Sequence, residues 1–333
     1  MSRLITTLIV AAAACAPVLA CTSMVVSGRA SASGKPMLWK HRDCSAELSF
    51  IERSEATDST LAFVALYNAG DSTLSEAWTG MNSSGFSIIN TASYNLAPDT
   101  ARYADREGEV MRAALQHCRT VDDFGQLLAD MRCPRGVQAN FGVIDAHGGA
   151  CYYEVNDHEM WRYDCDDTPD GVIVRTNFSF SKGREGGYGY IRYDNACELS
   201  RPYIEAHTLT PAVFTDTLSR SFYQSLVGRD MSDTTDRWLA DQDFIPRYSS
   251  SASIVIEGID GDDGPAGCVM WAALGYPPVA MTRRVTLDQV PEQLRPTLPG
   301  WLSPDAADAL GRKRRVFPVR NSEARYIDLD QLR

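Results

Sequence analysis

Along the chain, segments whose apolar residues have the spacing of a β-strand are interspersed with segments whose apolar residues have the spacing of a helix. Short runs rich in β-branched and aromatic residues, bounded by turn residues, are typical of β-strands. Two of the intervening turns, at 80–85 and 145–149, have the composition of hairpin connections. The pattern therefore predicts strands at 23–27, 36–39, 61–67, 86–90, 138–145, 151–155, 171–176, 253–257 and 268–274.

Helical segments are expected between these groups of strands. Residues 110–118 carry apolar side chains at helical spacing, and Thr120 with Asp123 resembles a capping box that starts a second helix. Ser303 precedes Pro304, a pair typical of a helix N-terminus because the missing N–H of Pro is not needed there. Since strands come in hairpins and helices in pairs, we expect an α+β fold of mainly antiparallel sheets with helices on the outer faces.

The composition limits the class of protein. Of 333 residues, 44% are hydrophobic and 23% are charged, and these values exclude a disordered, collagen-like or coiled-coil chain. The net charge of −11 argues against a phosphate-binding surface, and the basic run at 312–315 has no interleaved aromatics, so no nucleic-acid partner is expected. The five His residues lack zinc spacing, and the absence of HExxH and GxSxG argues against a metalloprotease and an α/β-hydrolase.

The first twenty residues have the features of a secretory signal peptide. Arg3 is followed by an apolar stretch over 4–16, and Val18 and Ala20 occupy the −3 and −1 positions of a cleavage site. The apolar stretch is too short for a transmembrane span. The sequence thus predicts export, to the periplasm or as a secreted protein, with residues 1–20 removed.

Cleavage there would make Cys21 the N-terminal residue, and three interpretations follow. Residues 18–21 resemble a lipobox, which would make Cys21 a lipid-modified anchor, although Leu19 stands where a small residue is usual. An N-terminal Cys can instead be a nucleophile that carries its own base, because an α-amine with a pKa of about 7.7–8.0 can accept the thiol proton. Cys21 could also be an ordinary cysteine beside a cleavage site. The predicted strand that begins at Ser23 leaves no room for the polar tether that usually follows a lipidated Cys.

The residues after Cys21 resemble the start of the N-terminal nucleophile (Ntn) hydrolases. The chain runs Cys-Thr-Ser, then a hairpin, then Lys40-His41-Arg42-Asp43. This is similar to the branch of choloylglycine hydrolases, penicillin V acylases, acid ceramidase-like amidases and isopenicillin-N acyltransferases, in which an N-terminal Cys cleaves linear amide C–N bonds. The family pattern after the hairpin is Arg-Asn-x-Asp. The resemblance implies that Cys21 is the nucleophile, that Asp43 orients its α-amine, and that Lys40 or Arg42, which share a strand face, fills the basic role.

Three later segments extend the resemblance. Residues 80–90 match a family motif that ends in an oxyanion-hole Asn, a place taken by Asn90. The strand over 171–176 is followed by Asn177, which in the family faces the nucleophile, and Arg192 resembles an Arg that closes the site. A side-chain amide can donate to an oxyanion without adding charge. Each residue also has an ordinary interpretation, the Asn residues as turn caps and Arg192 as a cation on a helix surface.

The resemblance also implies an architecture and a function. It predicts a four-layer αββα sandwich formed by a single domain over residues 21–333, with a C-terminal extension from about residue 285. We expect hydrolysis of a linear amide in an N-acylated small molecule, such as an N-acyl amino acid or a bile-acid conjugate, through a Cys21 thioester and without cofactor or metal. The alternatives are a dipeptidase, an acyltransferase in which an amine outcompetes water, and a non-catalytic ligand-binding lipoprotein anchored through Cys21. The sequence does not indicate an oligomeric state.

Two further expectations concern the loops and the remaining cysteines. The Gly- and Tyr-rich segments at 93–105 and 179–190 are expected to form the substrate pocket. Seven cysteines follow Cys21, and in an oxidising compartment some should form disulfides while at least one stays free. The plausible pairs are Cys118–Cys133 and Cys151–Cys165, because each pair flanks a single helix or strand pair.

Overall fold

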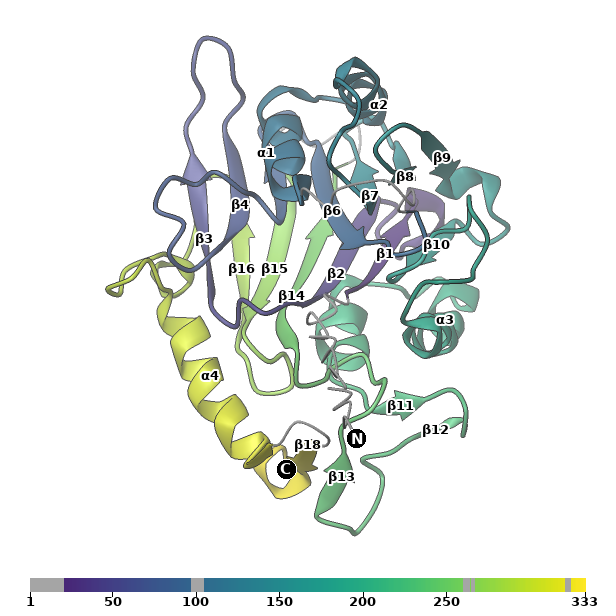
Figure 1. Ribbon diagram of the computed structural model, residues 1–333, viewed down its shortest axis with the longest axis vertical. Coiled ribbons are helices and arrows are strands. Elements are labelled where there is room, and N and C mark those ends of the chain that lie inside the picture. The colour runs from purple at the N-terminus through teal and green to yellow at the C-terminus, as the bar shows by residue number, and fades with distance from the viewer. Residues whose placement is uncertain (1–20, 97–104, 260–263, 265–266, 321–324) are drawn as a thin grey trace, which may run out of the picture.

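The computed structural model describes residues 21–96, 105–259, 264, 267–320 and 325–333, so the predicted signal peptide lies outside the described residues. Two large antiparallel sheets face each other, and helices cover their outer surfaces (Figure 1). The predicted α+β sandwich in four layers, helix, sheet, sheet and helix, is therefore confirmed.

The six-stranded sheet has the order β10-β1-β2-β14-β15-β16, and every neighbouring pair is antiparallel. Its central strands are almost continuous runs of buried residues, because both faces of the sheet are covered. The hairpin of β1 and β2 places Thr22 opposite His41 and Ser23 opposite Lys40. The strands are Thr22–Val26 (β1), Met37–Asp43 (β2), Val172–Arg175 (β10), Ser250–Glu257 (β14), Val269–Leu274 (β15) and Thr282–Thr286 (β16).

The seven-stranded sheet is a meander in which β3 to β9 follow one another in sequence order. The turn between β5 and β6 is closed by Asn82, whose side-chain oxygen accepts from the backbone N–H groups of Ser84 and Phe86. Gly85 in this turn has φ +86°, a left-handed conformation that favours glycine. The strands are Ser49–Ser54 (β3), Phe63–Asn68 (β4), Thr79–Asn82 (β5), Ser87–Ala92 (β6), Ala139–Ile144 (β7), Ala150–Val155 (β8) and Met160–Asp164 (β9).

Helices cover the outer face of each sheet. α1 (Glu107–His117) and α2 (Val121–Asp130) pack on the seven-stranded sheet. α3 (Tyr190–Glu205) and the π-helical segment η3 (Val213–Leu218) pack on the six-stranded sheet (Figure 1). Three apolar layers result, one between the sheets and one beneath each pair of helical elements.

The expected strands and helix starts are present, and the differences lie where the apolar pattern is weak. Thr120 and Asp123 form the capping box of α2, and Ser303 caps α4 (Pro304–Val316) by accepting from the N–H of Ala306. β14 begins at Ser250 rather than at residue 253, because its first residues include serines that give no hydrophobic signal. Nothing in the sequence pattern predicts β3, β9 and β16, which are sheet edges with partly exposed polar residues.

The chain after β16 adds elements around one end of the sandwich. α4 contacts β15, and Gly275 permits the close approach, because its φ is +98° and a Cβ there would lie 2.4 Å from the Cβ of Ala309. β18 (Arg325–Asp328) joins β13 (Trp238–Ala240) and β17 (Val319–Arg320) in a small sheet. The short strands β11 (Tyr223–Gln224) and β12 (Arg229–Asp230) form a separate hairpin. None of the described helices has the length and apolar character that crossing a membrane requires.

The expected disulfides are not formed, since none of the eight described cysteines is part of a disulfide. Cys118 is buried at the end of α1, whereas Cys133 is exposed beyond α2. Cys151 lies in the apolar layer beneath α1 and α2, and Cys165 lies in the layer between the sheets, so the seven-stranded sheet separates them. The prediction was wrong because two residues that flank one element in sequence need not project to the same face.

Candidate active site

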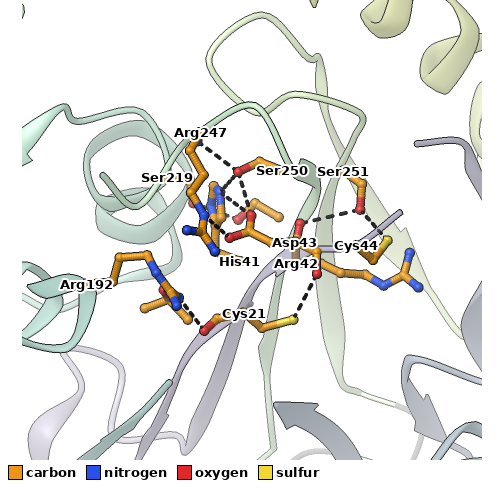
Figure 2. Close-up of polar contacts among 12 residues, drawn as sticks. Cys21, His41, Arg42, Asp43, Cys44, Arg192, Ser219, Arg247, Ser250 and Ser251 are labelled. Carbon is orange, nitrogen blue, oxygen red and sulfur yellow. Dashed lines mark hydrogen bonds and ion pairs between the residues drawn. The ribbon is translucent and has the colours of Figure 1, made fainter. Parts of the chain in front are cut away.

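Cys21 immediately precedes β1 and lies at the end of the hairpin that carries residues 40–43 (Figure 2). Its side chain is buried, with an exposed fraction of 8%, and its thiol donates to the backbone oxygen of Asp43 over 3.7 Å. The hairpin register therefore brings Cys21 and the predicted polar segment together. This short-range pairing is the part of the site that the sequence could specify.

The two basic candidates on β2 reach different partners. The Lys40 ammonium donates to Asn90 Oδ1 at 2.5 Å and to the Trp78 backbone oxygen at 2.7 Å, so it links the two sheets. The Arg42 guanidinium donates to Asn68 Oδ1 at 2.8 Å and lies 5.3 Å from the centre of the Trp78 ring. Of the two, Lys40 is the residue that contacts the predicted oxyanion donor Asn90.

The Asp43 carboxylate is fully buried and held by residues that sequence reasoning missed. Arg247 Nε donates to Oδ2 at 2.8 Å, and the Ser250 hydroxyl donates to Oδ1 at 2.7 Å (Figure 2). The ring of His41, with Nε2 at 2.8 Å from Ser250 Oγ, completes the network. Arg247 is 204 residues from Asp43 along the chain, and no local motif marks it. The serine-rich start of β14 was the single signal that polar side chains enter this region.

Arg192 connects Cys21 with Asn177. Its Nη1 donates to the Cys21 backbone oxygen at 2.7 Å and to Thr22 Oγ1 at 3.0 Å, while its Nη2 donates to Asn177 Oδ1 at 2.9 Å. Its exposed fraction is 1%, so the alternative of a helix-surface cation is wrong. Gly189 makes this packing possible, because a Cβ there would lie 2.3 Å from Arg192 Nη2.

Comparison with known proteins identifies the fold. The family model described as acyl-coenzyme A:6-aminopenicillanic acid acyl-transferase matches residues 45–194. The structure of a mutant conjugated bile acid hydrolase from Clostridium perfringens is similar with a TM-score of 0.51 and 9% identity, over 81% of this chain and 93% of that chain. The fold is that of a choloylglycine hydrolase-like Ntn hydrolase.

Two further solved structures are similar with lower TM-scores. An N-acylethanolamine-hydrolyzing acid amidase ortholog from Caenorhabditis elegans has a TM-score of 0.47 and 13% identity, over 70% of this chain and 91% of that chain. Penicillin V acylase from Agrobacterium tumefaciens has a TM-score of 0.40 and 12% identity, over 81% of this chain and 87% of that chain. No curated protein matches the chain in sequence.

The electrostatic environment of Cys21 in this Ntn fold is dominated by burial and buried cations. Burial raises the pKa of the Cys21 thiol, and the charge of Lys40 counteracts this effect more strongly than that of Arg42. Because burial disfavours the charged form of each group, it lowers the pKa of Lys40 to about 8 and that of Arg192 to about 10. His41, with a pKa lowered by burial to about 4, is neutral at pH 7. The cations near the thiol are thus placed to stabilise negative charge that develops there.

The two loops expected to form the pocket lie against each other. Ser93 and Ser179 are joined through their hydroxyl oxygens at 2.7 Å, and Asn95 Nδ2 donates to the Ser179 backbone oxygen at 2.8 Å. The rings of Tyr94 and Tyr188 pack edge to face with centres 5.4 Å apart. Residues 97–104 of the first loop lie outside the described residues.

Replacing Arg247 with Met is expected to lower the free energy of unfolding by about 3–5 kcal/mol, because the buried carboxylate of Asp43 would lose its cation. Burial disfavours the Arg247 charge, yet the charge and hydrogen bond of Asp43 outweigh this and raise the pKa of the guanidinium. Urea unfolding of the wild type and the variant measures the loss. The double variant Arg247→Met/Asp43→Asn, which removes both charges, should recover part of it.

Arg312→Met provides the matched control. Arg312 pairs with Asp308 at 2.9 Å, but both side chains are exposed, and pairs of this kind contribute about 0–1 kcal/mol. If Arg247→Met costs no more than Arg312→Met, the Asp43 network does not stabilise the site.

Proposed function

We propose that the protein is an exported cysteine hydrolase that cleaves a linear amide bond through Cys21, after residues 1–20 are removed. The observation that carries the proposal is the position of Arg192, which donates both to the Cys21 backbone oxygen and to Asn177. Lys40, whose charge acts on the Cys21 thiol, holds the second amide, Asn90. Arg192 thus ties Asn177 directly to the residue that would become the N-terminus, while a cation near the thiol positions Asn90.

The two amides are suited to stabilise an oxyanion because their oxygens are already engaged. Arg192 donates to Asn177 Oδ1 and Lys40 donates to Asn90 Oδ1, so each amide presents its NH2 group to other partners. One Asn177 N–H bond is used by the Ala92 backbone oxygen at 2.9 Å, which leaves the second for the substrate. Fixed donors of this kind stabilise the tetrahedral intermediate without reorganising during the reaction.

The reaction follows from these roles. The α-amine of Cys21 takes the thiol proton, and the thiolate attacks the amide carbon to give an oxyanion that accepts from Asn177 and Asn90. The C–N bond breaks, the leaving amine receives the proton from the α-ammonium, and an acyl thioester remains on Cys21. Water then attacks the thioester carbon and loses a proton to the α-amine. The C–S bond breaks, the Cys21 sulfur takes the proton back from the α-ammonium, and a carboxylic acid leaves.

We propose an N-acylated small molecule as the substrate, of the class of N-acyl amino acids or bile-acid conjugates. The similar protein from Clostridium perfringens is a conjugated bile acid hydrolase, which supports an amide of this size. The match to an acyltransferase family over residues 45–194 supports the variant in which an amine rather than water takes the acyl group from Cys21. Both reactions pass through the same thioester, and the acceptor present decides between them.

Mass detection of the acyl-enzyme tests the function and identifies the substrate together. The exported protein is incubated with a set of N-acyl amino acids and bile-acid conjugates, quenched in acid and digested. We expect a mass increase equal to the acyl group on the peptide that begins with Cys21, removable by hydroxylamine as a thioester is. Acyl transfer to a different residue, or turnover with no acylated Cys21 peptide under rapid quenching, would contradict the proposal.

The intact mass of the same preparation separates the enzyme from the anchored ligand-binding lipoprotein. The chain should begin at Cys21 and carry no additional mass, because the reaction needs both the free α-amine and the free thiol. A diacylglyceryl adduct on Cys21 would occupy the thiol and rule out the nucleophile.

A further inference from the structure

A cavity of about 820 Å³ lies beside the Asp43 network and is built by segments far apart in sequence. Cys44 in the loop after β2 and Ile191 in the first turn of α3, the neighbour of Arg192, form part of its wall. The remainder comes from other residues of that loop, from β11 and the turn after it, from the segment between β13 and β14, from α4 and from the start of β18. A cavity of this volume accommodates one part of a small amide substrate.

The cations in the wall are already engaged. The Lys313 ammonium lies 3.1 Å from Glu47 Oε1. The Arg247 guanidinium is held by Asp43 at 2.8 Å and lies 3.6 Å from Asp243. The remaining cation, Arg325, lies with its guanidinium carbon 4.3 Å from the centre of the Tyr248 ring, over the ring face.

Two hydrogen-bond acceptors in the same wall, in contrast to these cations, are not engaged. Asp241 Oδ1 and Gln224 Oε1 are buried, and neither has a hydrogen-bond partner among the residues that the structure describes. Asp241 uses its other oxygen to accept from the Tyr248 N–H at 3.1 Å, and Gln224 has an exposed fraction of 5%. A buried acceptor without a donor is costly, so these two positions call for a ligand that donates hydrogen bonds.

We propose that this cavity binds a protonated amine of the substrate through Asp241 and Gln224. The inference rests on the proposed amide chemistry of Cys21 and adds the class of substrate: an amide that carries an ammonium group a few bonds from the scissile carbonyl. Burial raises the pKa of Asp241 to about 6, although the charges of Arg247 and Arg325 favour its ionised form. A bound ammonium would supply the hydrogen-bond donor that Oδ1 lacks among the described residues. An ammonium on the acyl side corresponds to a dipeptide-like substrate, and one on the amine side to an N-acylated diamine.

Binding to the Cys21→Ala variant tests the cavity separately from the chemistry, because no turnover can occur through a missing thiol. Three amides of matched length serve as probes in titration calorimetry: N-hexanoyl-n-butylamine, N-(6-aminohexanoyl)-n-butylamine and N-hexanoyl-1,4-diaminobutane. At least one of the two cationic probes should bind about tenfold or more tightly than the neutral probe, as expected for a charge-assisted hydrogen bond. The cationic probe that binds more tightly than the neutral one identifies which side of the scissile bond enters the cavity.

Variants of the wall assign the effect to the two acceptors. Asp241→Asn keeps an oxygen for the Tyr248 N–H but removes the charge, and it should abolish the preference for the cationic probe. Gln224→Met should weaken that preference severalfold, and it keeps the test decisive if Asp241→Asn fails to fold. Asp243→Asn is the matched control, because this partly exposed carboxylate in the same wall is engaged with Arg247, and it should change the preference less than twofold.

Equal binding of the three probes, or an unchanged preference in both Asp241→Asn and Gln224→Met, would overturn the cavity assignment. An equal loss of the preference for cationic probes in Asp243→Asn would also overturn it. In that case any negative charge in the wall would produce the preference, and not Asp241 in particular. These outcomes are separate from the fate of the proposed function, because hydrolysis of neutral amides by the wild type would support Cys21 chemistry even if no ammonium is recognised.

Discussion

The Cys21→Ala variant is expected to lose amide hydrolysis by a factor of about 10⁴ or more, measured as kcat on the substrate that the acyl-enzyme screen identifies. The reason is that the thiol is the group that bonds to the substrate, and no fixed donor can replace a missing nucleophile. Stability should remain near that of the wild type. Within the described part of the chain, the Cys21 thiol makes one weak hydrogen bond, 3.7 Å long, to a backbone oxygen.

Cys133→Ala is the matched control for this experiment. Cys133 is exposed beyond α2 and lines neither the site nor the neighbouring cavity. Removing its thiol should leave kcat within a few fold of the wild type, since the mechanism gives it no role. If Cys21→Ala retains activity while Cys133→Ala loses it, the nucleophile has been misassigned. The N-terminus of each variant is checked by intact mass, so that failed processing is not mistaken for lost chemistry.

The Asn177→Ala variant is expected to lower kcat by about 10²–10³, the effect of removing one preorganised oxyanion donor. Asn177 is fully buried, and Arg192 holds its oxygen, so its NH2 group is fixed before the substrate binds. KM should change far less than kcat, because the donor is needed when the carbonyl oxygen becomes an anion. Steady-state kinetics over a range of substrate concentrations measure kcat and KM. Single-turnover kinetics at saturating substrate measure the rate of the chemical steps.

A buried Asn in the turn between β5 and β6 separates this effect from general destabilisation. Asn82 is buried, donates to the Leu115 backbone oxygen at 3.0 Å, and accepts from the Phe86 N–H at 3.1 Å. Asn82→Ala and Asn177→Ala should each lose about 1–3 kcal/mol of stability, because each leaves buried polar groups unbonded. The loss in kcat is expected for Asn177→Ala alone. An unchanged kcat in that variant would remove Asn177 from the oxyanion site.

The sequence by itself determined the features that depend on near neighbours in the chain. The apolar run of β10 identified a buried strand, and the caps at Thr120 and Ser303 marked helix starts, because a cap bonds N–H groups within three residues. The pairing of the segment after Cys21 with the segment before Asp43 also followed from local pattern, since the Ser- and Gly-containing connection at 27–36 separates two apolar strand-like runs. Edge strands such as β9 escaped the pattern because partly exposed strands need no apolar run.

The tertiary structure alone decided which polar side chains meet. Arg247 reaches Asp43 across 204 residues, and Lys40 rather than Arg42 contacts Asn90, because the separation of the two sheets and the direction of each side chain select the partner. Cys151 and Cys165 stay apart because a sheet lies between their layers. Local pattern cannot encode such contacts. They depend on the packing of elements whose sequences are unrelated, and that packing turns a cysteine at a predicted cleavage site into a candidate nucleophile with fixed partners.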